Sequence, residues 1–235
     1  MLYLIGLGLN ERGISKEGLL AIDRCAKVYL EGYTVDFPYD VEELKFGNKK
    51  IEVLERGEVE SNNLIKEAKG RKIALLVYGS PLFATTHMSL IQDAHSQKVR
   101  VRVIYSASVF DGIAETGLQL YKFGKISSMP KWSGDYEPDF LQYVEENKSI
   151  EAHSLILVDI GLGFKKALVQ LEMCAQKKHV KLDKILVCSR IGVEGKQIFY
   201  AMPDILRRKD IEAPFCFIVP GELHFMEKEV VEGFE

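Results

Sequence analysis

Short apolar segments alternate with longer amphipathic segments along the first half of the chain, and this order limits the possible folds more than any other feature. The apolar segments, typical of strands, cover 2–5, 27–31, 51–54, 72–78 and 99–105, and the helix-like segments between them include 15–26, 61–69 and 85–98. A strand-helix-strand order favours a parallel sheet covered by helices. The pattern therefore predicts an N-terminal α/β domain with a mostly parallel sheet over residues 1–108.

The second half of the chain has a different order. Helices are predicted at 137–147 and 165–178, and strands at 154–160, 183–191, 196–202 and 215–219. The last strands follow one another without intervening helices, which is typical of an antiparallel or mixed sheet. We therefore expect a C-terminal α/β domain with a mixed sheet over residues 109–235, a long loop at 130–139, and a ligand cleft between the two domains.

Composition excludes several classes of protein. The chain is 47% hydrophobic and 28% charged with a net charge of -3, which is typical of a globular protein without the basic surface of a nucleic-acid binder. Four scattered cysteines, without paired spacing, favour reduced structural thiols over disulfides or a metal site: Cys25, Cys174, Cys188 and Cys216. The N-terminal segment turns polar too early for a signal peptide or membrane span. These features predict a soluble cytoplasmic protein.

The segment 78–88, YGSPLFATTHM, follows a buried strand and precedes a helix. Gly79 allows a ligand to approach the main chain, and Pro81 fixes a turn that ends the strand. Thr85 or Thr86 is expected to cap the helix. Because open α/β sheets bind ligands at the carboxyl ends of their strands, this turn is a candidate binding site.

The first loop carries part of a dinucleotide-binding pattern. Gly6 and Gly8 follow the first strand, and Glu31 ends the second strand. The third glycine of the G-x-G-x-x-G motif is replaced by Glu11, whose carboxylate would repel a pyrophosphate, and the helix starts only near Ser15. A nicotinamide cofactor is therefore disfavoured. Glycines that serve only the turn, or a loop against another small ligand, remain as interpretations.

His87 is a candidate general base, since histidine titrates near neutral pH. Its place in the first turn of a helix disfavours the protonated form, and no nucleophile motif accompanies it. We expect a structural or substrate-facing residue and assign no catalytic side chain.

Four motifs together resemble the diphthine synthase family, a branch of the tetrapyrrole methylase-like S-adenosylmethionine methyltransferases. They are MLYLIGLGLNERGIS, YGSPLFATTHM, SASVFDGIAETGLQLYKFGK and IVPGELHFMEKEVV. The resemblance extends along essentially the whole chain, and ATTH and GLQLYKFGK are its specific parts.

The resemblance implies a homodimer of two α/β domains of the tetrapyrrole methylase type, with S-adenosyl-L-methionine in the cleft between them and S-adenosyl-L-homocysteine as product. It implies repeated methylation of the amino group of 3-amino-3-carboxypropyl-histidine on translation elongation factor 2, a step of diphthamide biosynthesis. Neither nucleic acid nor membrane is implied as a partner. The number of methyl transfers, and a further methyl ester, stay open.

The resemblance also implies a set of cofactor contacts and no metal. These residues are Leu9, Ser80, Phe83, Ser108, Val109, Val158, Ile191 and Phe215. Four of them depart from the family pattern: Ser80 stands where aspartate is usual, Phe215 stands where histidine is common, and Phe83 and Val109 also differ from the usual residue. Transfer of an already activated methyl group depends mainly on positioning, which fits the lack of a catalytic motif.

Two alternatives remain. A methylase of the same fold acting on a corrin or porphyrin precursor would share the opening glycine loop, but the YKFGK segment favours the diphthamide branch. A relative that has lost catalysis and only binds would be consistent with the departure at Ser80.

Overall fold

The chain divides into two compact units, Met1–Asp111 and Gly112–Glu235, in a computed structural model that describes residues 1–132 and 139–235. Each unit has its own sheet and its own hydrophobic core, so the expected α/β class with two domains is confirmed. The predicted loop at 130–139 falls largely outside the described residues. In the part of the chain that is described, no helix combines the length and apolar character needed to cross a membrane.

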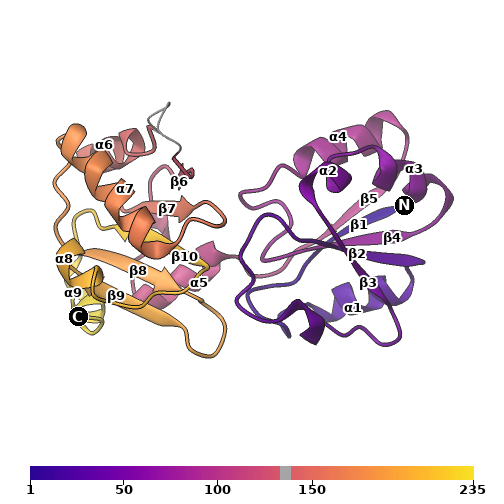
Figure 1. The fold of residues 1–235 in the computed structure, drawn as a ribbon, viewed down its shortest axis with the longest axis horizontal. Coiled ribbons are helices and arrows are strands. Elements are labelled where there is room, and N and C mark those ends of the chain that lie inside the picture. Colours follow the sequence, from indigo (N-terminus) through magenta and orange to yellow (C-terminus); the bar gives the residue numbers. More distant parts are fainter. Residues whose placement is uncertain (133–138) are drawn as a thin grey trace. The chain divides into compact units, whose positions relative to one another are not determined.

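The first unit is built on a five-stranded sheet in the order β3-β2-β4-β1-β5 (Figure 1). Its strands are β1 (Leu2–Gly6), β2 (Lys27–Glu31), β3 (Ile51–Leu54), β4 (Ile73–Val77) and β5 (Val101–Ile104). All four strand pairs are parallel. Their carboxyl ends consequently lie at one edge of the sheet.

Helices cover both faces of this sheet. They are α1 (Lys16–Asp23), η1 (Val41–Glu43), α2 (Arg56–Val59), α3 (Asn63–Gly70) and α4 (Met88–Ser96). Because successive side chains of a strand point to opposite faces, Leu2 and Leu4 pack with α2, α3 and α4, whereas Tyr3 and Ile5 pack with α1. Figure 1 shows α1 on the opposite side of the sheet from α2 and α4. Ser15 caps α1 by accepting a hydrogen bond from the amide of Gly18.

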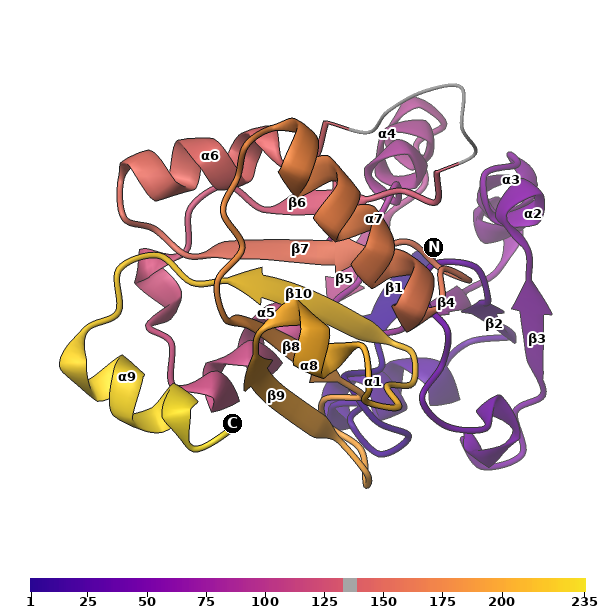
Figure 2. The same ribbon diagram turned by 60° about the vertical axis from the view of Figure 1, so that its left-hand side comes forward.

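The second unit also contains a five-stranded sheet, in the order β6-β7-β10-β8-β9 (Figure 2). Its strands are β6 (Ser127–Met129), β7 (Ser154–Val158), β8 (Ile185–Ser189), β9 (Gln197–Ala201) and β10 (Phe215–Val219). The β6-β7 pair is parallel and the other three pairs are antiparallel. β6 was not predicted, because a three-residue strand beginning with two serines carries no alternating pattern.

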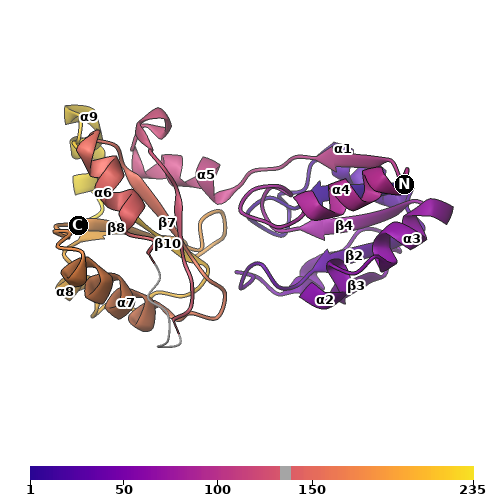
Figure 3. The ribbon, with the colours of Figure 1, turned by 90° about the horizontal axis from the view of Figure 1, so that it is seen from above.

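The helices of the second unit pack on both faces of its sheet (Figure 3). They are α5 (Val109–Gly112, which straddles the division), η2 (Ile113–Thr116), η3 (Leu120–Lys122), α6 (Gln142–Ser149), α7 (Phe164–Lys177), α8 (Pro203–Leu206) and α9 (Phe225–Glu232). One core joins α6, α7 and α8 to the sheet, and Phe164 and Phe217 are among its members. α9 lies on the other side of β8 from α7 and α8.

A buried ionic cluster fastens α9 to the rest of the second unit. Glu227 is fully buried, and its carboxylate accepts hydrogen bonds from His153 Nε2 (3.0 Å) and Lys122 Nζ (2.6 Å). It also accepts from the main-chain amides of Gln119 (2.9 Å) and His224 (2.8 Å). Burial acts to raise the pKa of Glu227, but these donors outweigh it and bring the pKa down to about 2.

Two of the motifs that indicated the family therefore meet in this cluster. Lys122 belongs to YKFGK, and Glu227 belongs to PGELHFMEKE. Their role in this structure is to stabilise the second unit.

We predict that Glu227→Gln lowers the free energy of unfolding by about 3 kcal/mol near neutral pH, because a buried charge pair loses one partner. The folded pKa lies below the ordinary value of 4.5, so this contribution is complete above pH 4.5 and is lost as the pH falls towards 2. Urea unfolding from about pH 6 to pH 3 should show a shallower loss of stability in the variant than in the unsubstituted protein.

The matched control is Glu229→Gln, on the exposed face of the same helix. It should leave the stability and its pH dependence unchanged. Equal behaviour of the two variants would contradict a stabilising role for the cluster.

Candidate functional site

Three adjacent strands of the first sheet carry the predicted site residues of the first unit. β4, β1 and β5 are neighbours and run in the same direction, so the loops that follow them share one edge. Leu9 follows β1, Ser80 and Phe83 follow β4, and Ser108 and Val109 follow β5. The fold thus brings residues from three separate sequence segments to one edge of the sheet.

This edge includes the point where the chain connections change direction. From β1 the chain passes through α1 to β2, and from β4 it passes through α4 to β5, on the opposite side of β1. α1 and α4 pack on opposite faces of the sheet. The connections that follow β1 and β4 therefore leave in opposite directions and on opposite faces of the sheet. Open α/β sheets bind ligands at such points.

Main-chain hydrogen bonds join these two loops beyond the ends of the strands. The amide of Gly8 donates to the carbonyl of Gly79 (3.2 Å), and the amide of Gly79 donates to the carbonyl of Gly8 (2.9 Å). Both glycines have positive φ angles, +75° and +68°, which residues with a side chain rarely adopt. A Cβ atom on Gly6 would lie only 2.6 Å from the carbonyl oxygen of Gly79, so the close approach of the loops requires glycine there too.

The loops after β4 and β5 lie next to each other at Gly79. A Cβ atom at Gly79 would be in ordinary van der Waals contact, at 3.8 Å, with the carbonyl oxygen of Ala107 and the Cα of Ser108. Peptide groups of the two loops therefore meet at this edge of the sheet. Phe83 stacks on Phe110 at 6.0 Å between ring centroids and adds an apolar aromatic surface beside the β4 loop. These features fit a nucleoside-containing cofactor.

Side-chain hydrogen bonds also hold the loops that follow β1 and β5. The hydroxyl of Tyr78 donates to the carbonyl of Leu9 (3.2 Å), and burial raises the pKa of Tyr78, so the phenol remains a donor. Ser106 Oγ donates to the carbonyl of Gly13 (3.0 Å) and ties the β5 loop to the first loop. Ser108 donates to Asp111 through both its amide (2.6 Å) and its hydroxyl (2.9 Å). The side chain of Ser108 is thus engaged within its own turn.

The predicted threonine cap of α4 is wrong. His87 is the residue before α4, and no side chain caps the helix. Thr85 Oγ1 donates instead to the carbonyl of Pro81 (3.0 Å), and Ser80 closes its own turn by accepting from the amide of Phe83 (3.2 Å). The loop is therefore held by internal contacts rather than by the helix terminus.

The structure also decides between the two roles expected for His87. Its side chain is only 1% exposed and lies 3.2 Å from the carboxylate of Glu31, measured from Nε2 to Oε2. His87 therefore does not face a substrate, and the expected alternative, a structural residue, is confirmed. The same pairing buries Glu31, which a nicotinamide dinucleotide would need for its ribose, and α1 does not begin until Lys16.

The three predicted site residues of the second unit also share one edge of their sheet. Val158 ends β7, Ile191 follows β8, and Phe215 begins the antiparallel strand β10. The pairing of Phe215 with Ser189 and of Cys216 with Leu157 brings them together. Phe215 packs edge-on against Phe164 (5.5 Å) and Phe217 (5.7 Å), so this edge is apolar where many relatives are expected to have histidine.

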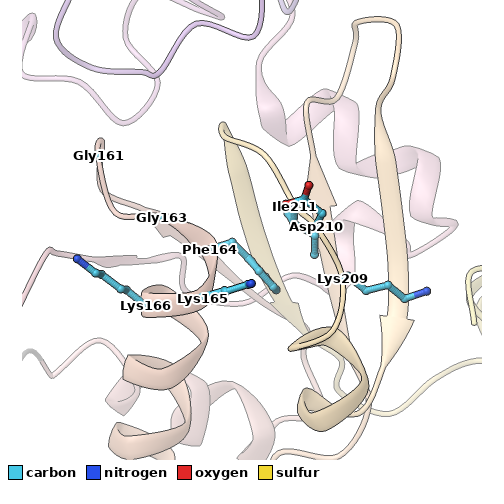
Figure 4. Close-up of a pocket in the computed structure, with 8 residues that line it drawn as sticks. All are labelled: Gly161, Gly163, Phe164, Lys165, Lys166, Lys209, Asp210 and Ile211. Carbon is cyan, nitrogen blue, oxygen red and sulfur yellow. The ribbon is translucent and has the colours of Figure 1, made fainter.

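A pocket of about 360 Å³ lies beside this edge (Figure 4). Its lining combines the loop before α7, the start of that helix and the segment before β10: Gly161, Gly163, Phe164, Lys165, Lys166, Lys209, Asp210 and Ile211. Phe164 belongs to both the pocket and the Phe215 cluster. The charged residues of the lining are Lys165, Lys166, Lys209 and Asp210.

Comparison with known proteins identifies the class that this fold and site represent. Residues 1–203 match the family model of the tetrapyrrole (corrin/porphyrin) methylases. The match includes seven of the eight predicted cofactor contacts, all but Phe215. The chain therefore belongs to the tetrapyrrole methylase family.

The similar individual proteins define the branch. The chain is 37% identical to a diphthine synthase of Methanothermobacter thermautotrophicus, over 97% of this chain and 93% of that protein. It is 41% identical to the human diphthine methyl ester synthase, over 100% of this chain and 95% of that protein. A crystal structure of a diphthine synthase superimposes with a TM-score of 0.89 at 31% identity, covering 99% and 95% of the two chains. Within the family, this chain is a methyltransferase of the diphthine synthase group, as its motifs indicated.

Sequence analysis missed the contacts that hold the site. The pairing of Glu31 with His87 joins residues that are far apart in the chain, and each had been assessed alone. Phe110, which stacks on Phe83, was seen only as part of a motif. The one available signal was a charged residue at the end of an apolar strand, which is costly unless a partner is present.

We predict that Gly6→Ala lowers the free energy of unfolding by about 2 kcal/mol, because the added methyl group pushes against the Gly79 carbonyl and separates the two loops. Thermal or urea unfolding measures the effect. Gly57→Ala is the control, since a Cβ atom there meets nothing within 4 Å. A stability of Gly6→Ala equal to that of the control would show that the loops can separate without cost.

Proposed function

We propose that this chain transfers methyl groups from S-adenosylmethionine to the amino group of a 3-amino-3-carboxypropyl-histidine on translation elongation factor 2. The observation that carries the proposal is the main-chain edge formed by the β1, β4 and β5 loops, whose glycines allow these loops to approach one another closely. Membership of the diphthine synthase group supplies the substrate class.

The proposed cofactor contacts have different roles in the first unit. Ser80 and Ser108 would contribute from the turns after β4 and β5, where the carbonyl of Ser80 and the amide, hydroxyl and carbonyl of Ser108 already form hydrogen bonds within their own turns. Leu9 and Phe83 would supply apolar surface, and Val109 follows at the start of α5. Such a site holds a ligand by shape and by peptide hydrogen bonds.

Val158, Ile191 and Phe215 would add an apolar contact surface from the second unit. All three are aliphatic or aromatic and lie at one sheet edge. The Phe215 ring is restrained by two neighbouring phenylalanines, so it can present a fixed surface but no hydrogen bond. We include it in the site for this packing role.

Catalysis in this proposal rests on positioning. S-Adenosylmethionine supplies a methyl group already activated on a sulfonium. The protein then has to hold the acceptor nitrogen in line with the bond that breaks, and well-oriented reactants gain large rate factors without a dedicated acid or base. His87 is buried and paired, so we assign it no proton transfer from the substrate.

The remaining features of the proposal follow the family. We propose a cytoplasmic homodimer that acts on a protein substrate and binds neither nucleic acid nor membrane. The net charge of -3 agrees with the absence of a nucleic-acid partner.

The decisive experiment incubates the protein with methyl-labelled S-adenosylmethionine and elongation factor 2 that carries the carboxypropyl intermediate. Label on the modified histidine, counted by mass spectrometry, would support the proposal and give the number of methyl groups. Label only on a corrin or porphyrin precursor would assign the chain to the other activity of the family. Absence of cofactor binding in calorimetry would indicate a relative without catalysis.

We predict that Leu9→Arg abolishes cofactor binding, with an affinity loss of more than about a hundredfold. The reason is that a long charged side chain would occupy the proposed cofactor site at the carboxyl ends of β1, β4 and β5. Leu9 lies outside the two hydrophobic clusters of the first unit, so the fold should persist. Titration calorimetry with S-adenosylhomocysteine measures the loss, and circular dichroism checks folding.

Leu19→Arg introduces the same charge on α1 at a position that is 43% exposed. It should bind the ligand normally. An unchanged affinity of Leu9→Arg would place the cofactor elsewhere.

A further inference from the structure

A buried acid-base pair joins the end of β2 to the loop that carries Ser80 and Phe83. The side chain of Glu31 is 0% exposed and that of His87 is 1% exposed, with 3.2 Å between Oε2 and Nε2. The proposed methyl transfer uses neither side chain. Burying two ionisable groups is costly, so the pair calls for a reason beyond packing.

The hydrogen bonds around His87 determine its protonation. Nδ1 lies 2.9 Å from the carbonyl oxygen of Pro81, which can only accept, so Nδ1 must carry a proton. Nε2 faces the carboxylate of Glu31, and the pair therefore holds one further proton between these two atoms. Among the described residues, neither carboxylate oxygen of Glu31 has a hydrogen-bond partner that meets strict geometry. The buried charge of Glu31 thus depends on His87 for compensation.

The other side of His87 holds the ligand loop. The Pro81 carbonyl accepts hydrogen bonds from both His87 Nδ1 and Thr85 Oγ1. Between them, Ala84 has a φ of +52°, a left-handed conformation that costs energy for a residue with a side chain. Such a conformation persists only where surrounding contacts enforce it.

We propose that Glu31 and His87 form a positioning pair that holds the Pro81–His87 loop, and with it Ser80 and Phe83, in the conformation that binds the methyl donor. The proposal rests on the proposed function for the identity of the ligand. Its structural part, the tether of the loop to β2, can be tested without any ligand.

Other ionisable groups lie around the pair. Thr86 Oγ1 donates to Glu60 Oε1 (3.4 Å) at the end of α2, and the guanidinium of Arg56 lies 5.3 Å from the ring of Tyr33. The Tyr33 hydroxyl is buried near Glu31, and burial together with this carboxylate raises the pKa of Tyr33, so it stays neutral. Glu60 is therefore the additional charge that acts on His87 in the working pH range.

These surroundings give the tether a pH dependence. Burial acts to lower the pKa of His87, but the hydrogen bonds to Glu31 and Pro81 and the charge of Glu60 outweigh it, so the pKa lies above 6.5. The stabilisation is complete below pH 6.5 and is lost as the pH rises through the folded pKa. Ligand affinity should follow the same course.

Glu31→Gln removes the negative charge of residue 31 but can keep its contact with His87. The new amide can donate to a neutral Nε2, while Nδ1 still donates to Pro81, so the loop stays tethered without an extra proton. His87→Leu removes both contacts and leaves Glu31 unpaired. His95→Gln, on the exposed side of α4, is the control.

Nitrogen NMR of the imidazole across a pH titration should show that His87 keeps both ring protons to a pH above 6.5 in the unsubstituted protein and loses one of them at a lower pH in Glu31→Gln. Calorimetry with S-adenosylhomocysteine should show affinity that weakens as the pH rises above neutral in the unsubstituted protein and in His95→Gln. Glu31→Gln should bind with an affinity that does not change over that range. His87→Leu should lose at least about tenfold in affinity, with faster amide exchange in the loop.

Three results would overturn the proposal: a His87 that loses its second ring proton at or below pH 6.5 in the unsubstituted protein, the same pH dependence in Glu31→Gln, or normal affinity in a folded His87→Leu. If His87→Leu does not fold, the first two measurements still decide. If the unsubstituted protein binds no S-adenosylhomocysteine, the proposed function fails, while NMR and amide exchange still decide whether the pair holds the loop.

Discussion

The reciprocal main-chain pairing of Gly8 with Gly79 is the constraint on which the site depends. It extends the contact between β1 and β4 past the ends of the strands, at the point where their connections leave on opposite faces. Without it the two loops would separate, and their peptide groups would lose their fixed positions beside Ser108. Gly6 is part of the same constraint, since only a residue without a Cβ atom lets the loops come this close.

The proposed site, made largely of peptide groups, would tolerate the departures from the expected family pattern at Ser80 and Phe215. Where the main chain binds the ligand, a change of side chain alters the surface but not the hydrogen-bonding groups. Ser80 keeps the turn through its carbonyl, and Phe215 is held by the core of the second unit. The backbone that presents these residues matters more than their identity.

The sequence predicted the elements well and the contacts poorly, for a physical reason. β2, β3 and β10 lie where their apolar runs predicted, and β10 has the strongest signal because all of its residues are buried. β6 and the short helix α2 were missed, since three or four residues carry too little periodicity. The threonine cap of α4 was wrong because a local preference for capping lost to a hydrogen bond with Pro81. Pairings such as Glu31 with His87 depend on the fold, which no local pattern contains.

The two buried glutamate-histidine pairs show how the second hydrogen bond of an imidazole decides its behaviour. In the second unit, His153 Nδ1 accepts from the amide of Gly221 (2.9 Å), so that nitrogen cannot be protonated, and Lys122 already balances Glu227. Burial accordingly lowers the pKa of His153, and the pair stays fixed near neutral pH. In the first unit, His87 Nδ1 donates to a carbonyl, and the ion pair of Glu31 in the described part of the chain is with His87, which therefore supplies the charge. A glutamate and a histidine thus form a contact that does not change near neutral pH in the second unit, and a pH-sensitive contact beside the proposed cofactor site in the first unit.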